Sequence, residues 1–284
     1  MKLLRYGEKG RERPGLIDGE GRIRDLSAHI PDLAGEALAP AVLERLQGLD
    51  PASLPLVDGA VRIGPCVGTV GKFVAISLNY FDHAVEAGQP VPAEPVILLK
   101  ATSSISGPND DVVIPRGCGK LDWEVELGIV IGRAGVYIEE DEALGHVAGY
   151  CVVNDVSARD FQLERGGTWD KGKGCDTFGP IGPWLVTPDE AGDTADLRLW
   201  LDVDGRRYQD GTTRSMIFGV ARIVSYVSGF MSLQPGDVIT TGTPPGNGMA
   251  QTPPVFLQPG NVMRLGIDRL GEQRQRVVPA TPRR

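Results

Sequence analysis

The sequence is poor in the side chains that several common functions need. Its 284 residues include only three histidines, His29, His83 and His146, and only 6% are aromatic. A metal centre built on several imidazoles would need nearly all of them, so any metal here is expected to take oxygen ligands. Acidic residues outnumber basic ones, 37 to 29, for a formal net charge of -8, and no block of lysine or arginine interrupts this balance. A nucleic-acid-binding surface is therefore not predicted.

Long apolar runs and cysteine pairs are also missing. No stretch approaches the roughly 20 residues that cross a membrane, and the opening segment MKLLRYGEKG has neither the apolar core nor the cleavage site of a secretory leader. The four cysteines, Cys66, Cys118, Cys151 and Cys175, are far apart and form no CxxC motif. We therefore expect a cytoplasmic protein with reduced thiols.

What the sequence does contain is an ordinary globular composition divided by many turns. Hydrophobic residues make up 41% and charged residues 23%, while 38 glycines and 22 prolines separate short apolar runs. Strands are expected over residues 73–78, 94–100, 125–132, 147–156, 197–205 and 262–267, and helices over 80–88, 139–147 and 217–231. The predicted fold class is mixed α/β and mostly β.

The first 65 residues predict a unit of their own. Residues 2–7 and 13–27 indicate short strands, with a hairpin turn at DGEG, residues 18–21, and residues 40–49 indicate a short helix that begins with proline. The composition changes after this segment. We therefore predict a small N-terminal domain, 1–65, followed by a larger domain, 66–284.

Two glutamates stand one residue apart in an apolar strand. Strand side chains alternate between faces, so Glu124 and Glu126 are expected on one face with Cα atoms about 7 Å apart. Exposed strands often carry glutamate on the wet face, which is the alternative explanation. Asp155 ends a second apolar run, and acids in that position tend to face clefts. Three neighbouring carboxylates repel one another unless they are neutralised, so we predict a hard dication such as Mg²⁺ among them.

A histidine and a glutamate lie three residues apart in the expected helix 80–88. At this spacing His83 and Glu86 are neighbours on one helical face and can form a hydrogen bond. A carboxylate beside an imidazole sets its tautomer and raises its basicity, as a base that activates water requires. An incidental pair on a surface turn is the alternative. His29 and His146 lack comparable neighbours, and we interpret both as structural or solvated.

Two segments rich in glycine and proline have the character of pocket walls. Residues 169–184 carry two tryptophans, and we expect a loop that lines a pocket with Lys173 or Lys171. Residues 241–248, TGTPPGNG, offer backbone N–H groups and threonine hydroxyls that suit an anion such as a carboxylate. A plain turn is the alternative for this second segment. It lacks the GK[ST] of a P-loop, which argues against an ATP site.

Six stretches, taken in order, resemble the fumarylacetoacetate hydrolase superfamily. They are NYFDHAVE, EPVILLK, DWEVELGIVIG, VVNDVSARDFQ, WDKGKGCDTFGPIGPW and GDVITTGTPPG. The resemblance covers about residues 70 to 268, and the ordered set is highly specific. It implies a β-roll of twisted mixed sheets, usually assembled as a homodimer, that acts on a small-molecule oxo-acid.

The resemblance also implies roles for the acids and the histidine. Glu124, Glu126 and Asp155 would hold a divalent metal, commonly Mg²⁺ or Mn²⁺. His83 and Glu86 match the catalytic pair of the family, on a segment that in many members forms a lid over the substrate.

Four further positions match the family pattern. Lys173 matches its lysine, Arg159 and Gln162 would line the site, and Thr243 would contact the carboxylate end of the substrate. The resemblance implies a metal that grips a 1-carboxylate and a 2-oxo group and accepts electron density from the breaking bond. Lys173, together with Arg159, would then stabilise a developing oxyanion or help to protonate the enolate.

The reaction is a separate question, because the superfamily hydrolyses or decarboxylates oxo-acids and also includes isomerases and hydratases. The intact His83–Glu86 pair favours attack of water at C4 and cleavage of the C3–C4 bond of a 2,4-dioxo acid, which releases pyruvate. Residues 161–184 look most like members that act on 2,4-diketo-3-deoxy sugar acids, such as the rhamnonate or fuconate derivatives. The predicted enzyme is therefore a Mg²⁺-dependent carbon–carbon bond hydrolase.

Other functions stay open at this point. Decarboxylation of oxaloacetate at the same metal needs no activated water, and a dienoic oxo-acid could be isomerised or hydrated there. A non-catalytic, metal-stabilised binding protein is an alternative from a different class. A non-haem iron oxygenase is disfavoured, because it needs two histidines and His83 is the only one in a suitable setting.

Overall fold

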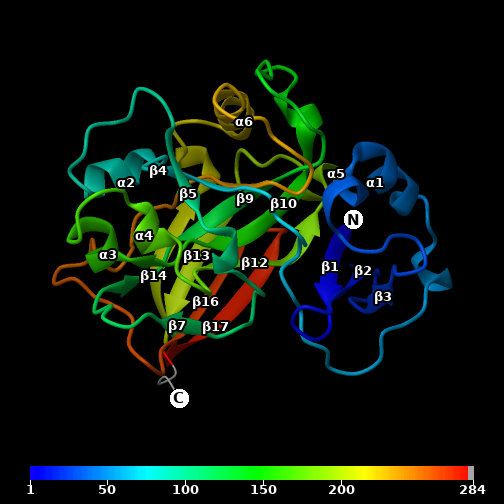
Figure 1. The fold of residues 1–284 in the computed structure, drawn as a ribbon, viewed down its shortest axis with the longest axis horizontal. Coiled ribbons are helices and arrows are strands. Elements are labelled where there is room, and N and C mark those ends of the chain that lie inside the picture. Colours follow the sequence, from blue (N-terminus) through cyan, green and yellow to red (C-terminus); the bar gives the residue numbers. More distant parts are fainter. Residues whose placement is uncertain (281–284) are drawn as a thin grey trace.

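The computed structural model describes residues 1–280. Residues 281–284, the end of the predicted 66–284 domain, lie outside the described part. Strands form two large sheets and a two-stranded ribbon, and short helices surround them (Figure 1). The predicted fold class, mixed α/β and mostly β, is confirmed. No helix within residues 1–280 is long and apolar enough to cross a membrane.

A ten-stranded sheet forms the frame of the molecule. In order across the sheet its strands are β3 (Ile23–Asp25), β2 (Arg13–Ile17), β1 (Lys2–Tyr6), β12 (Gly179–Val186), β10 (Val147–Asn154), β9 (Val125–Ile131), β15 (Val238–Thr240), β4 (Phe73–Ser77) and β5 (Val96–Lys100), and β6 (Ile105–Ser106) pairs with β12 outside this path. The pairs β15–β4 and β12–β6 are parallel, and the other pairs are antiparallel.

A second sheet packs against the middle of the first. Its five strands are, in order, β14 (Arg206–Thr212), β13 (Arg198–Val203), β16 (Val262–Ile267), β17 (Gly271–Pro279) and β7 (Val112–Ile114), and the separate ribbon pairs β8 (Leu121–Asp122) with β11 (Ser157–Ala158). Strand β9 contacts β13 and β16, and β10 contacts β16 and β17. Every residue of β9 and β10 is buried, because a second layer covers one face and loops and helices cover the other.

The helices are short and lie at the ends and edges of the sheets. They are α1 (Pro40–Gln47), α2 (Phe81–Glu86), α3 (Arg159–Leu163), α4 (Asp170–Lys173), α5 (Pro188–Ala191) and α6 (Val220–Ser228), with 3₁₀ turns η1 (Gly35–Leu38), η2 (Pro51–Ser53), η3 (Thr102–Ser104), η4 (Ala143–His146) and η5 (Thr213–Ser215). The predicted helix 217–231 shortens to α6, because Gly219 and Gly229 cap it. The predicted helix 139–147 was wrong beyond the single turn η4. Val147 pairs with Ile131, so this segment is a hairpin connection pinned at both ends.

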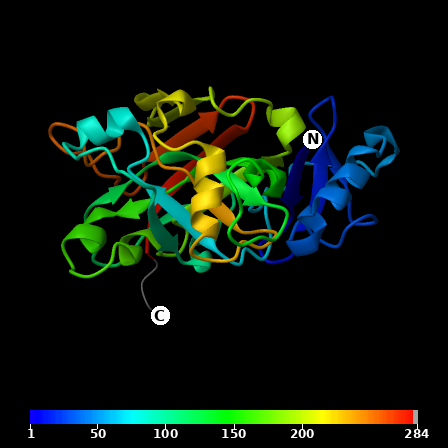
Figure 2. The same cartoon turned by 90° about the horizontal axis from the view of Figure 1, so that it is seen from above.

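The N-terminal strands continue the large sheet. β1 pairs with β12, with Lys2 opposite Val186 and Leu3 opposite Leu185, and the first strands and α1 lie together at one end of the molecule (Figures 1 and 2). Leu3 shares a buried apolar cluster with Val153 of the central strand β10. The division into domains 1–65 and 66–284 stays a prediction.

One predicted loop is a central strand instead. Within residues 169–184 we expected an irregular pocket wall, but Gly179–Val186 forms β12, between β1 and β10. Gly179 is needed because a Cβ there would lie 2.5 Å from the ring of Phe73. The close approach of the Phe73 side chain thus selects glycine at a position that local propensity assigns to a turn. Only the first part of the segment, with α4, reaches the site described next.

Candidate active site

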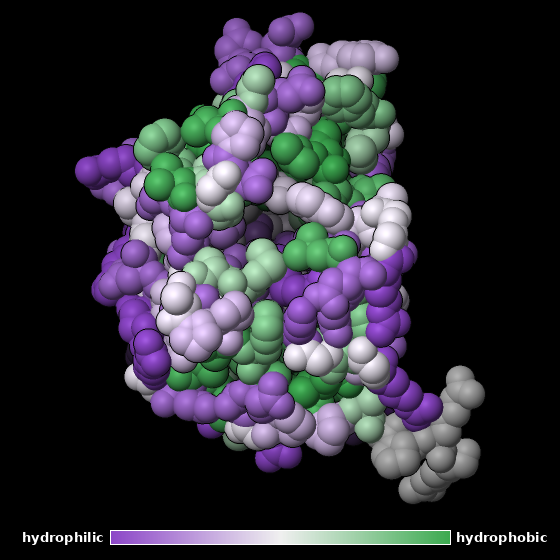
Figure 3. All heavy atoms as spheres, turned by 90° about the vertical axis from the view of Figure 1, so that its left-hand side faces the viewer, coloured by the Kyte–Doolittle hydropathy of each residue, from purple (hydrophilic) through white to green (hydrophobic). Residues whose placement is uncertain are grey.

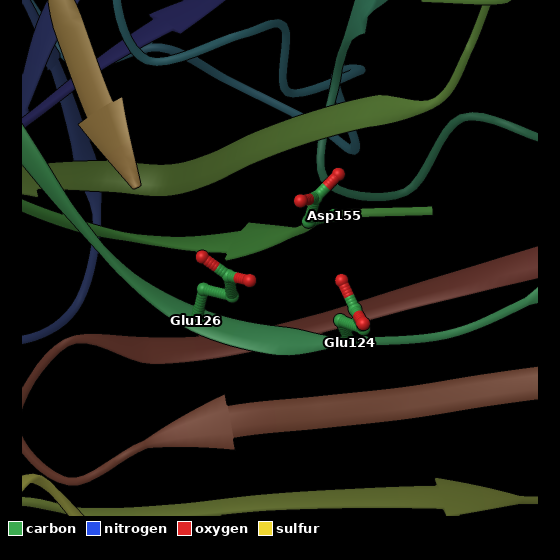
Figure 4. A group of neighbouring side chains, drawn as sticks. All are labelled: Glu124, Glu126 and Asp155. Carbon is green, nitrogen blue, oxygen red and sulfur yellow. The ribbon is translucent and has the colours of Figure 1, made fainter. Parts of the chain in front are cut away.

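Three acids converge beside the central strands (Figure 4). Glu126 lies in β9, and Glu124 directly precedes that strand. The pairing of Val153 in β10 with Glu126 brings the end of β10 alongside, and the N–H of Asp155 donates to the carbonyl of Glu124 at 2.9 Å. All three side chains are buried, and one oxygen from each lies within 4.8 Å of the others. The sequence-predicted acids therefore share one point in space.

Three basic side chains surround these acids. Lys173, at the end of α4, donates from Nζ to Glu124 Oε2 at 2.6 Å and to Asp155 Oδ2 at 2.7 Å. Lys100, at the end of β5, donates to Asp155 Oδ1 at 2.5 Å. Arg159 donates from Nη2 to Glu124 Oε1 at 2.6 Å. The competing lysine, Lys171, instead donates to the backbone carbonyls of residues 165 and 166.

These pairs leave one acid without a cation. Burial favours the neutral form of Glu124, but the charges of Arg159 and Lys173 outweigh it and lower its pKa. Glu126 has no ion pair with any residue in 1–280 and accepts one hydrogen bond, from the N–H of Gly242 at 2.7 Å. Burial, followed by the charges of Asp155 and Glu124, therefore raises the pKa of Glu126 well above its ordinary value. Glu126 is thus the acid of the cluster whose ionised form has no cation beside it within residues 1–280, and the raised pKa favours its neutral form.

This arrangement fits a hard dication. A small cavity of about 20 Å³, lined by Glu124, Glu126 and Asp155 among others, lies at the acids, and this is enough for one ion or water molecule. Carboxylates bind Mg²⁺ or Ca²⁺ at about 2.0 to 2.6 Å, so two ligands of one ion are at most about 4 to 5 Å apart. The 4.8 Å grouping of the oxygens is compatible with that limit. Three buried oxygen donors, of which Glu126 has no partner cation within residues 1–280, suit such an ion.

The predicted His–Glu pair is formed on α2. His83 Nδ1 and Glu86 Oε2 are 2.9 Å apart, and Glu86 also accepts the backbone N–H of Gly246 at 3.0 Å. The bond to Glu86 occupies Nδ1, which leaves Nε2 as the other ring nitrogen. His83 lines the small cavity at the acids, so the pair and the three carboxylates face the same space.

A larger cavity of about 490 Å³ adjoins the acids and is lined by His83, Glu124, Arg159, Gln162 and Lys173, among others. Figure 3 shows the side of the molecule on which α2 and α3 lie, where hydrophobic and hydrophilic residues are mixed around a hollow surface. The volume suits a small organic molecule.

Thr243 and the backbone N–H groups of TGTPPGNG, which we expected to contact an anion, are hydrogen-bonded within the protein instead. The hydroxyl of Thr243 donates to the carbonyl of Val125 at 2.9 Å and accepts from Gln209 at 2.8 Å, so its single proton is already committed. Its contact with a substrate carboxylate stays a prediction. The N–H groups of residues 242, 246, 248 and 249 in and beside TGTPPGNG donate to protein carboxylates, which leaves them unavailable to a bound anion.

Residues 72–278 match the family model described as fumarylacetoacetate (FAA) hydrolase C-terminal. The chain belongs to the fumarylacetoacetate hydrolase family. The resemblance predicted from six motifs is thus confirmed at the level of the family, and the sugar-acid subtype stays a prediction.

Relatives of this family member span its whole length. It is 66% identical over 276 residues to a protein of Burkholderia ambifaria named "Putative hydrolase". The aligned residues cover 97% of this chain and 98% of that protein. Fumarylacetoacetate hydrolase from Exiguobacterium antarcticum is 35% identical with a TM-score of 0.88, over 99% of this chain and 100% of that one. Maleylpyruvate hydrolase from Sphingobium sp. SYK-6, solved with manganese(II) and pyruvate, is 28% identical with a TM-score of 0.81 at the same coverage. These likenesses indicate an enzyme of hydrolase type.

Sequence reasoning missed two residues that the structure places at the candidate site. Asp122 is fully buried and accepts from Arg159 Nε at 2.8 Å. It stands two residues before Glu124, and the same alternation that paired Glu124 with Glu126 could have found it. Lys100 ends the apolar run of β5, which is the signal that identified Asp155.

The remaining histidines and the cysteines lie outside the site. His146 is buried and its Nδ1 is 3.0 Å from the carbonyl of Arg133, which agrees with a structural role, and His29 is exposed. All four cysteines are free thiols.

Proposed function

We propose that this enzyme hydrolyses the C3–C4 bond of a 2,4-dioxo acid, an acylpyruvate, with Mg²⁺ as its metal and Mn²⁺ as a possible substitute. The observation that carries the proposal is the His83–Glu86 pair placed over the same cavity as Glu124, Glu126 and Asp155. Decarboxylation needs no residue that activates water, whereas hydrolysis does.

Glu124, Glu126 and Asp155 would hold the metal, and when bound it supplies a positive centre that chelates the 1-carboxylate and 2-oxo group and draws electrons from C3. The charge balance of the chain agrees with an anionic substrate. Four buried carboxylates, counting Asp122, face three cations, so with all four acids ionised, as metal ligands require, the protein groups carry one excess negative charge. A dication reverses that excess, and one substrate carboxylate then brings the site to neutrality.

His83 would take a proton from water through Nε2 while Glu86 holds the ring by Nδ1 and stabilises the imidazolium. The hydroxide adds to C4, the C3–C4 bond breaks, and its electron pair stays on C3, which becomes the methyl group of pyruvate after protonation. The acyl fragment leaves as a carboxylic acid. Lys173, whose Nζ lies between Glu124 and Asp155, is placed to stabilise the developing negative charge.

Within this class we propose 2,4-diketo-3-deoxy-rhamnonate or -fuconate as substrates, since residues 161–184 look most like members that act on them. We also propose a cytoplasmic homodimer. Exposed apolar side chains on the edge strand β5, Val96 and Leu99, and the neighbouring Phe230 support an interface there. Light scattering on the purified protein checks the dimer.

The test is a Mg²⁺ assay across acylpyruvates and oxaloacetate, with pyruvate and the second acid both measured. We expect pyruvate and acid in equal amounts, and His83→Ala should lower kcat for hydrolysis by about 10²-fold or more, as for loss of a general base. Exposed His29→Ala is the matched control. Turnover of oxaloacetate alone, or a single product from a dienoic oxo-acid, would instead establish the decarboxylase or the isomerase.

A further inference from the structure

The cavity has an outer part that the proposed reaction does not use. The larger cavity touches residues that the small cavity at the acids does not, among them Gln89, Leu163, Trp169, Asn247, Met249 and Ala250. A substrate with its carboxylate and 2-oxo group at the acids would extend its acyl tail towards these residues. Their chemistry therefore selects the tail.

Asn247 lies at a rigid position in this wall. It stands between two glycines, and a Cβ at Gly246 would lie 1.9 Å from the carbonyl oxygen of Tyr208, while one at Gly248 would lie 2.0 Å from that of Val255. Both contacts are far shorter than any real Cβ contact, so only glycine permits this backbone path. The loop can therefore present Asn247 in one place.

Two acids, the buried Asp122 and the more exposed Glu86, hold the same loop on both sides. Asp122 accepts the N–H groups of Gly248 at 2.6 Å and Met249 at 3.2 Å, and Glu86 accepts that of Gly246. Asp122 also holds Arg159 and Glu86 also holds His83. The position of Asn247 is thus coupled to the catalytic pair and to the acids.

Two amide groups offer free donors to this cavity. Asn247 is 1% exposed, its Oδ1 accepts the N–H of Ala250 at 3.0 Å, and its Nδ2 donates to no residue in 1–280. Gln162 is 6% exposed, its Oε1 accepts from Arg159, and its Nε2 likewise donates to none within the described chain. The bonds to the oxygens define which amide atom is nitrogen in each case. Both side chains therefore present N–H groups that lack acceptors.

The two permanently charged basic side chains that line this cavity are held at its acids. Among its lining residues Arg159 and Lys173 are basic, and both are paired with buried carboxylates. A second carboxylate on the substrate tail would lose water there without gaining a cation.

We infer that Asn247 determines specificity by donating from Nδ2 to a hydroxyl on an uncharged acyl tail, and that tails ending in a carboxylate are rejected. The orientation of the substrate rests on the proposed function. The proposed function concerns the reaction at the acids, whereas Asn247 would determine which acyl tail is bound.

The test uses 2-oxo acids that lack the C4 carbonyl, so that they bind but cannot be cleaved. Calorimetry on the Mg²⁺-loaded enzyme compares 5-hydroxy-2-oxohexanoate, 2-oxohexanoate and 2-oxohexanedioate. We expect the hydroxylated acid to bind about 10-fold more tightly than 2-oxohexanoate, which corresponds to one neutral hydrogen bond. The dicarboxylate should bind at least about 10-fold more weakly than 2-oxohexanoate.

Asn247→Asp keeps the acceptor for Ala250 but removes the donor, and Asn247→Leu removes both. In Asn247→Leu the 10-fold preference for the hydroxyl should fall to about 1, because no hydrogen-bonding group remains on the side chain. In Asn247→Asp the preference should be smaller than in the wild type, since the carboxylate can only accept the O–H of the hydroxyl. Gln258→Leu, which removes an exposed amide outside the cavity lining that does not contact Asn247, should retain the preference. A preference kept in both Asn247 variants, a wild-type ratio near 1, or tighter binding of the dicarboxylate would overturn the inference. If the ratios hold but no acylpyruvate is hydrolysed, only the proposed reaction is wrong.

Discussion

Glu126 offers the sharpest test of the metal site, because it is the acid of the buried cluster that has no partner cation within residues 1–280. Its carboxylate is 2% exposed, forms no ion pair within residues 1–280, and accepts a single backbone hydrogen bond. Glu126→Gln keeps the shape of the side chain and removes the charge. Without metal the variant should therefore be more stable than the wild type, and with metal it should respond less.

The size of the response follows from binding linkage. Mg²⁺ at 100 times its Kd stabilises the wild type by about 2.7 kcal/mol, or roughly 5 to 10 °C in Tm for a protein of this size. If the loss of Glu126 weakens binding about 100-fold, the same Mg²⁺ concentration stabilises the variant by only about 0.4 kcal/mol, or roughly 1 °C. Melting curves with and without Mg²⁺, after removal of metal by a chelator, measure both quantities.

The stability difference between metal-free Glu126→Gln and the wild type should change with pH in one direction. Because the pKa of Glu126 is raised in the folded protein, its ionisation opposes folding progressively as pH rises above the ordinary value of 4.5. The Tm advantage of metal-free Glu126→Gln should thus be smallest in acid and grow towards neutral pH. Glu44→Gln, which removes an exposed acid on α1, should show neither effect. A full Mg²⁺ response in Glu126→Gln would refute its role as a ligand, and equal metal-free stability would refute the absence of a partner cation beside it.

Two further predictions concern stability. Lys100→Met leaves Asp155 with Lys173 as its remaining partner and should lower the free energy of unfolding by about 3 kcal/mol or more, measured in urea. Burial opposes ionisation of Glu12 and Asp110, but hydrogen bonds from Arg62 outweigh it and lower both pKa values. Their contribution is present above about pH 4.5 and lost as pH falls further. Arg62→Ala should therefore shift acid unfolding to higher pH, and an unchanged midpoint would contradict this assignment.

Much of the β-structure could be predicted from local pattern. Apolar and β-branched runs mark β4, β5, β9, β10, β13 and β16, and the structure forms all six. The same approach missed β12, where Gly179 fits only because Phe73 packs against it from β4. It also overextended the helix at 139–147, since the pairing of Val147 with Ile131 is not visible in local sequence.

The residues of the site likewise divide into those that local spacing predicted and those that it did not. The spacing of Glu124 and Glu126, and that of His83 and Glu86, indicated which side chains share a face, and the structure brings each pair together. The partners that balance these charges come from distant segments. Lys100 reaches Asp155 across 55 residues, and Arg159 reaches Asp122 across 37.

The sequence by itself determined the periodic features of this protein: its β-rich class, the facing acids of β9, and the family motifs. Periodicity suffices for these because the backbone repeat sets which way each side chain points. Only the tertiary structure decided that Glu126 has no partner cation within residues 1–280 and that the Thr243 hydroxyl donates to the carbonyl of Val125. It also decided that the Nδ2 group of Asn247 has no acceptor among the described residues. Burial, charge and hydrogen bonding depend on distances between segments that the fold brings together, and no local pattern encodes those distances.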